Sequence, residues 1–146
     1  MIIAEIGLNH LGSKEYLSDY LSCLLDSPVD AITLQIREKQ FYLNTGFDNL
    51  ELPLETYGKI AKQVKNSGKK FGMALSDLSL LSFFEDKVDF YKILSKDIGD
   101  DEFVDKLINK INKPMFVSTG MSSYSTINCF LDKVKKDKKK NINLIH

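Results

Sequence analysis

The spacing of hydrophobic residues changes repeatedly along the chain, from the pattern of a strand to that of a helix and back. The sequence therefore predicts strands and helices in alternation. Short, mostly apolar runs are typical of buried strands, whereas apolar residues three and four positions apart form one face of a helix. Six runs predict strands, at residues 2–6, 31–36, 70–75, 88–94, 115–118 and 141–146.

Five helical patterns fill the intervals between these runs. Ser13, Ser76 or Asp77, and Asp100 or Asp101 can cap helices, and Pro53 suits a first helical turn. The expected inward-facing residues are Leu17, Tyr20, Leu21, Leu24 and Leu25 in the first helix, Tyr57, Ile60, Ala61 and Val64 in the second, Phe103, Leu107, Ile108 and Ile111 in the fourth, and Ile127, Phe130, Leu131 and Val134 in the fifth. The third helix is short and runs through Phe84, and residues 37–52 are expected to form a long polar loop.

Strict alternation of strands and helices predicts an α/β fold. Strands that are joined by helical crossovers pair in parallel, either in a doubly wound sheet or in part of a (β/α) barrel. The pattern of strands and helices alone does not distinguish these two folds. The chain has 146 residues, with no internal repeat or flexible linker, so residues 1–146 are expected to be one domain. A complete barrel usually needs about 250 residues.

Composition and charge narrow the possible partners. The chain is 43% hydrophobic and 27% charged, which is typical of a globular protein, and Lys+Arg and Asp+Glu both number 20. A balanced charge gives no sign of a nucleic-acid or membrane partner. Residues 133–140 hold six lysines and are expected to be a solvated helix end and loop, a polyanion site being the lesser option.

The cysteines and the N-terminus suggest a cytoplasmic location. Cys23 and Cys129 both fall in helical patterns, and we expect buried free thiols rather than a disulfide or a metal site. The N-terminal residues show no signal peptide, and no apolar run approaches the roughly 20 residues of a membrane span.

Polar residues follow the predicted strands at their carboxyl ends, where ligands bind in α/β folds. They lie in the last part of each strand or just after it: Glu5, Asn9 and His10 for the first strand, Gln35 and Arg37 for the second, Lys92, Ser95 and Asp97 for the fourth, Ser118 and Thr119 for the fifth, and His146 for the sixth.

Lys92 lies in an apolar strand, so it must bind an anion, form a Schiff base or extend its amine to water. Ser118-Thr119-Gly120 suits either an anion site or a simple helix cap. His10 suits either catalysis or loop structure.

Five segments together resemble the sialic acid synthase (N-acetylneuraminate synthase) family, which includes legionaminic and pseudaminic acid synthases. They are residues 3–13 (IAEIGLNHLGS), 30–35 (DAITLQ), 90–97 (FYKILSKD), 113–121 (KPMFVSTGM) and 143–146 (NLIH). The resemblance implies an incomplete TIM-type (β/α) barrel of about six parallel strands and five helices. It implies a cytoplasmic transferase that condenses phosphoenolpyruvate with an N-acetylated amino sugar to a sialic-type acid, with release of phosphate.

The resemblance also implies roles for individual residues. Lys92, Ser95 and Ser118 would be catalytic and would hold phosphoenolpyruvate. Residues expected to bind substrate are Glu5, Asn9, His10, Gln35, Asp97, Thr119 and His146. The family uses a divalent metal, manganese or magnesium, whose two histidine ligands come from the last two strands of the barrel. We expect no metal ligand in this chain.

Several positions depart from the family pattern. Thr33 replaces a lysine that holds phosphoenolpyruvate, Leu11 replaces Asn or Glu, and Lys96 replaces glycine. The chain stops at the sixth strand, without the C-terminal antifreeze-like domain of the family. We therefore expect an inactive chain by itself, which pairs with a complementary fragment or with itself. The alternatives are a non-catalytic anion-binding remnant of the family and a Schiff-base aldolase that uses Lys92.

Overall fold

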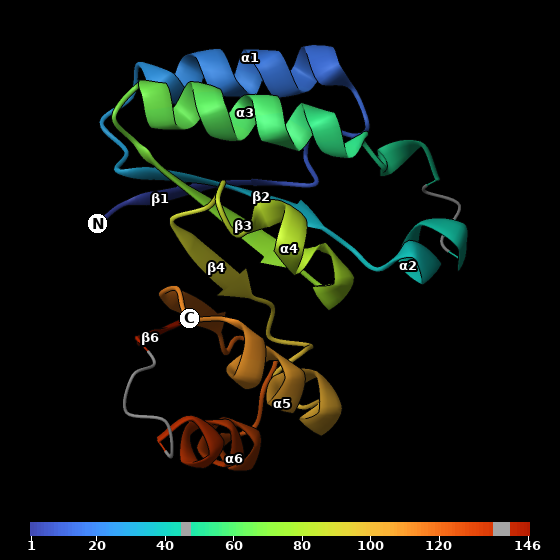
Figure 1. Ribbon diagram of the computed structural model, residues 1–146, viewed down its shortest axis with the longest axis vertical. Helices are drawn as coiled ribbons and strands as arrows, with labels where there is room; N and C mark the ends of the chain where they lie inside the picture. The colour runs from blue at the N-terminus through green and yellow to red at the C-terminus, as the bar shows by residue number, and fades with distance from the viewer. Residues whose placement is uncertain (45–47, 136–140) are drawn as a thin grey trace. The chain divides into compact units, whose positions relative to one another are not determined.

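The computed structural model describes residues 1–44, 48–135 and 141–146, and the chain divides into two compact units. The first unit is Met1–Asp89 and the second is Phe90–His146. Each unit contains three of the six predicted strands (Figure 1). The expectation of a single domain stays a prediction.

The first unit has three parallel strands, β1 (Ile3–Gly7), β2 (Ala31–Ile36) and β3 (Lys70–Leu75). β2 pairs with β1 on one side and with β3 on the other, and the register of the β1–β2 pair shifts between Glu5 and Gly7. Helices α1 (Lys14–Leu25) and α3 (Leu54–Asn66) lie on the same side of these strands (Figure 1). All three strands and both helices were predicted.

The apolar faces of the two long helices explain why they pack there. Leu17 and Leu21 of α1 are buried, and all four residues predicted to face inward from α3 are buried. On β2, alternate residues such as Ile32 and Leu34 are buried with them. Burying each such side chain contributes about 1.5–3 kcal/mol.

The segment after β2 corrects one prediction. We expected a long loop over residues 37–52, but it contains α2 (Lys39–Asn44) and a 3₁₀ turn at Asp48–Leu50, and residues 45–47 lie outside the described residues. Tyr42 is the reason, because its ring is 2% exposed and its hydroxyl accepts a hydrogen bond from the Arg37 N–H at 3.1 Å. A second 3₁₀ turn (Leu78–Leu80) and α4 (Leu81–Phe84) follow β3.

The second unit has the parallel strands β4 (Phe90–Ile93), β5 (Met115–Ser118) and β6 (Ile142–Ile145), with β5 between the other two. Helix α5 (Asp101–Lys110) connects β4 to β5, and α6 (Tyr124–Lys135) follows β5. Asp100, not Asp101, caps α5, since its carboxylate accepts a hydrogen bond from the Phe103 N–H at 3.0 Å. Lys133 of α6 forms ion pairs at 3.0 Å with Asp101 and Asp105.

Some details of the predicted faces were wrong. Val104 is buried in α5 where Phe103 was expected, and Phe103 is half-buried. The cysteine thiols are free as predicted, but both are exposed. Cys23 lies outside the Leu17–Leu21 stripe of α1, and Cys129 precedes the buried Phe130 of α6, so neither faces a core.

Two further predictions concern membrane-spanning helices and the lysine-rich segment. Within the described residues, no helix is long and apolar enough to cross a membrane. Of the lysine-rich segment 133–140, residues 136–140 lie outside the described residues, and Lys133 is bound to α5 instead of being simply solvated.

Candidate functional site

In the first unit, the strand face opposite the buried apolar residues carries polar side chains. Glu5 of β1 pairs in register with Thr33 of β2, and Gln35 lies two residues further along the same face. A Cβ atom added to Gly7 would lie 3.7 Å from the Glu5 side chain and 3.8 Å from that of Gln35. Glu5 and Gln35 are therefore brought together around Gly7.

Thr33 of β2 is buried and is hydrogen-bonded to the backbone of β1. Its side chain is 1% exposed, and its hydroxyl donates to the Ala4 carbonyl at 3.5 Å. Gly72 is its partner in register on β3. The position therefore contributes a neutral hydroxyl to the strand face.

The β1–α1 loop is held by a close backbone contact and by His10. A Cβ atom at Gly12 would lie 1.6 Å from the Asn49 carbonyl oxygen, and Gly12 has a φ of +74°. Only glycine fits such a position without moving the backbone. The Gly12 N–H donates to Nδ1 of His10 at 3.0 Å. Gly12 of the motif is therefore required by its close packing against Asn49, which could not be inferred from the sequence.

His10 is fully buried, with 0% of its surface exposed. Burial lowers the pKa of its imidazole below the ordinary value, because a charged ring loses its hydration. Since Nδ1 accepts from Gly12, the proton of the neutral ring belongs on Nε2. Nε2 has no hydrogen-bond partner among the described residues. In this structure the ring supports the loop, whereas Asn9 beside it is exposed.

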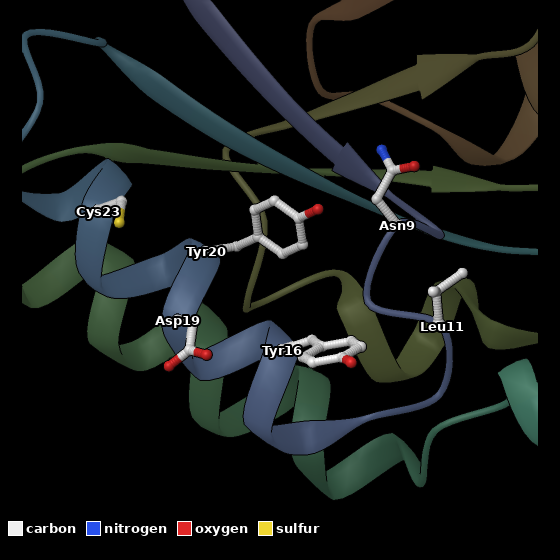
Figure 2. A pocket seen from close by; sticks show the side chains of 6 residues that line it. All are labelled: Asn9, Leu11, Tyr16, Asp19, Tyr20 and Cys23. Carbon is white, nitrogen blue, oxygen red and sulfur yellow. The ribbon is translucent and has the colours of Figure 1, made fainter.

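A cavity of about 370 Å³ opens between this loop and the outer side of α1. It is lined by Asn9, Leu11, Tyr16, Asp19, Tyr20 and Cys23. The tyrosine rings extend from α1 toward the part of the loop that carries Asn9 and Leu11 (Figure 2). Sequence reasoning missed this cavity because Tyr20 was assigned to the buried face of α1, whereas 44% of its surface is exposed.

In the second unit, Lys92 and Ser118 lie on one face of the sheet. Lys92 pairs in register with Phe116, and Ser118 follows Phe116 by two residues on β5. Because side chains alternate between the two faces of a strand, Ser118 lies on the same face as Phe116 and its neighbour Lys92. Both residues are half-buried, whereas Ile93 and Val117 on the other face are fully buried. The face can present an ammonium group and a hydroxyl to one anion.

Two hydrogen bonds fix the loops at the carboxyl ends of these strands. The Ser122 hydroxyl donates to the Ser95 carbonyl at 3.1 Å, which joins the loops after β4 and β5. The Thr119 hydroxyl donates to the Ile145 carbonyl at 3.1 Å and lies 3.5 Å from Nδ1 of His146. Thr119 and His146 are therefore brought together, and the Thr119 hydroxyl binds backbone.

Asp97 is 7% exposed and forms an ion pair with Lys96. Lys96 is one of the positions that depart from the family pattern. The Lys96 ammonium group neutralises the Asp97 carboxylate, so a ligand at this position would meet both charged groups together.

No metal site is found in the part of the chain that the structure describes. No group of three or more His, Cys, Asp or Glu residues there could hold an ion.

Another charged cluster lies after β2. The Arg37 guanidinium binds both carboxylate oxygens of Glu38, at 3.0 and 3.1 Å, and lies 4.0 Å from the centre of the Phe41 ring. Because Glu38 neutralises it, Arg37 is a poor candidate for an anion site.

The fold and these polar groups define a parallel β/α protein of the (β/α)-barrel class, with its candidate site at the carboxyl ends of the strands. Residues 24–146 match the NeuB family. The chain belongs to the NeuB family.

Sequence relatives agree with this assignment. A pseudaminic acid synthase from Campylobacter jejuni is 28% identical over 145 residues, which cover 84% of this chain and 41% of the relative. The chain thus spans less than half the length of this relative.

Solved structures support the barrel fold. An N-acetylneuraminic acid synthetase from Leptospira borgpetersenii superposes with a TM-score of 0.85 at 24% identity, over 99% of this chain and 53% of that one. The spore coat polysaccharide biosynthesis protein spsE from Bacillus subtilis gives 0.81 at 18% identity, over 100% and 43%. The six strands are those of a partial TIM-type barrel, as predicted.

Proposed function

We propose that this chain is the phosphoenolpyruvate-binding part of a synthase that condenses phosphoenolpyruvate with an N-acetylated amino sugar. The observation that carries the proposal is the shared face of Lys92 and Ser118 in a NeuB-family chain. An ammonium group and hydroxyl donors suit the carboxylate and phosphate of this substrate.

In this proposal each residue has a defined task. Lys92 binds one anionic group of phosphoenolpyruvate, and the hydroxyls of Ser95 and Ser118 donate hydrogen bonds to it. The bond from Ser122 to Ser95 keeps the first loop in place. The bound phosphoenolpyruvate is thereby oriented so that its methylene carbon forms the bond to the aldehyde carbon of the sugar. Water adds to the carbon that carries the phosphate, the C–O bond to phosphate breaks, and the two protons of water go to the aldehyde oxygen and to the leaving phosphate.

Calorimetry with phosphoenolpyruvate tests the site. Lys92→Met is expected to weaken binding by about ten- to hundredfold, because an ionic hydrogen bond is lost. Ser118→Ala is expected to weaken it less. Lys110→Met is the matched control, since Lys110 is an exposed lysine on α5 of the same unit. Equal affinity in all variants, or no binding by the parent chain, would exclude this site.

A second candidate is a non-catalytic anion-binding role within the same family. It is favoured by the buried, neutral Thr33, which removes a cation that the family uses. Release of inorganic phosphate separates the two functions. A synthase releases phosphate when phosphoenolpyruvate, N-acetylmannosamine, manganese and the part of a relative's barrel that this chain does not match are all present, whereas an anion-binding protein binds phosphoenolpyruvate without turnover.

A further inference from the structure

We propose that a cavity beside α3 is a binding site for a small phosphate-bearing anion. The cavity has a volume of about 330 Å³ and is bounded by α3 and by the segment that follows α4. It is lined by Gly58, Ala61, Lys62, Lys65, Asn66, Asp86 and Lys87. All of these residues belong to the first unit. The inference goes beyond the proposed function and does not depend on it.

One face of α3 forms the first wall of this cavity. The α3 residues that line it follow Gly58 by three, four, seven and eight positions, which is the spacing of a single helical face. Gly58 and Ala61 are small and leave space beside the helix. Lys62, Lys65 and Asn66 then bring two cationic side chains and one amide to the same face. The face therefore combines room for a ligand with donors for an anion.

Lys87 forms the second wall, and its ammonium group is held in place. The group donates to the Phe83 carbonyl at 2.8 Å and to the Asp86 carboxylate at 2.9 Å, and it lies 4.4 Å from the centre of the Phe83 ring. A Cβ atom added to Gly58 would lie 3.8 Å from Cε of Lys87. The lysine chain thus lies directly beside α3. A charge that is already positioned needs little ordering when a ligand binds.

The lining carries more positive than negative charge. It contains three lysines and one aspartate, a surplus of two positive charges. Outside the lining, Asp89 lies 3.9 Å from the Lys65 ammonium group, which is longer than a hydrogen bond. Lys62 is exposed and makes no hydrogen bond or ion pair within the described part of the chain. Both lysines therefore keep N–H donors for a further acceptor.

The Asp86 carboxyl shows that cations from both walls act on one point. Its pKa lies below the ordinary value, mainly because Lys87 donates a hydrogen bond to it, and the charge of Lys65 adds to this effect. A favourable position at the C-terminus of α3 accounts for Lys65 alone, but not for Lys87, which belongs to another segment. A phosphate group offers three strong acceptor oxygens, so it can accept from both walls at once.

The cavity lies away from the candidate site at the carboxyl ends of the strands. Asn66 is the last residue of α3, just before β3. Asp89, the neighbour of Lys65, accepts a hydrogen bond from the Phe71 N–H at 2.8 Å, near the start of β3. Both contacts place the cavity near the amino end of β3. Binding here can therefore be measured separately from binding at Lys92.

Nuclear magnetic resonance tests the proposal residue by residue. Inorganic phosphate is titrated into the isotope-labelled full chain at constant ionic strength. The amide signals of Gly58, Asn66 and Lys87 are expected to shift and to saturate. Lys62→Met is expected to weaken this binding about threefold, and the double variant Lys62→Met, Lys65→Met about tenfold, because each change removes one ammonium group. The spectra also show whether each variant is folded.

Lys59→Met is the matched control, since Lys59 is an exposed lysine of α3 that does not line the cavity. Its phosphate affinity should equal that of the parent chain. Equal affinity in the double variant and the control, shifts that do not saturate, or the same shifts with chloride would overturn the proposal. Lys92→Met is expected to leave the shifts unchanged, so the phosphoenolpyruvate site can fail without affecting this one. Loss of the shifts in Lys92→Met would also overturn the proposal.

A separate titration with glycerol 3-phosphate identifies the source of the phosphate group. Tighter binding of this ester than of inorganic phosphate would support a site for a phosphorylated metabolite. Equal or weaker binding of the ester would support a site for the free ion.

Discussion

The His10 side chain illustrates how burial decides the chemistry of a single residue. Its folded-state pKa lies below the ordinary value of 6.5, so the unfolded chain binds more protons than the folded chain as the pH falls through that region. The stability that His10 contributes is therefore present above the unfolded pKa and is lost as the pH falls below about 6.5. We expect the free energy of unfolding to decrease between pH 7.5 and pH 5.5.

Denaturant titrations across this pH range measure the effect. The chain has only two histidines, and the other, His146, is exposed. His10→Gln is expected to be less stable at pH 7.5 but to lose little further stability at pH 5.5. A variant with the same pH dependence as the parent would show that another group is responsible.

Leu11, which has a φ of +50°, offers a test of strain at one residue. Leu11→Asn replaces leucine with a residue that tolerates the left-handed conformation, so we expect the free energy of unfolding to rise by about 1 kcal/mol. Urea denaturation measures the change. A stability decrease would mean that the leucine side chain contributes packing within the unit.

Between elements, Lys69 joins two turns that are far apart in sequence. Its ammonium group donates to the carbonyls of Ser27 and Val29, at 2.7 and 2.8 Å, so it ties the turn before β3 to the turn before β2. Lys69→Met should reduce the free energy of unfolding by about 1–2 kcal/mol, since two charged hydrogen bonds are lost. Chemical denaturation measures this loss. Lys70→Met, at an exposed neighbour, should change stability by less than about 0.5 kcal/mol.

Helices and strands with one strongly apolar face could be predicted from the sequence, and the others could not. In α3, Tyr57, Ile60, Ala61 and Val64 follow the helical period and are all buried. In α1, periodicity could not separate a residue that faces the core from the exposed Tyr20, because both are apolar. Helix α2 was missed because it is only six residues long, and the burial of Tyr42 and its hydrogen bond with the Arg37 N–H are tertiary contacts.

For the whole molecule, ordered motifs predicted the family and the partial barrel, but not the environment of each site residue. Lys92 and Ser118 share a strand face, as expected from strand alternation. The Asp97–Lys96 ion pair and the burial of His10 depend on the conformation of loops. The spacing of hydrophobic residues does not predict loop conformation. The glycine at position 12 appeared as a loop residue, while its contact with Asn49 exists only in three dimensions.

The balanced charge of the whole molecule leads to a last prediction, about salt. Lys+Arg and Asp+Glu both number 20, so a phosphoenolpyruvate anion meets no net attractive field at long range. Its affinity must then come from a few groups at short range, Lys92 among them. The Debye length is about 10 Å at 0.1 M salt, so such contacts are only partly screened.

We therefore expect phosphoenolpyruvate affinity to fall by less than about tenfold between 50 and 300 mM KCl, as measured by calorimetry. Lys92→Met should bind weakly at both salt concentrations, with little further salt dependence. A loss of a hundredfold or more in the parent chain would contradict this expectation. It would mean that several lysines act together on the anion, as a polyanion site at the lysine-rich segment 133–140 would require.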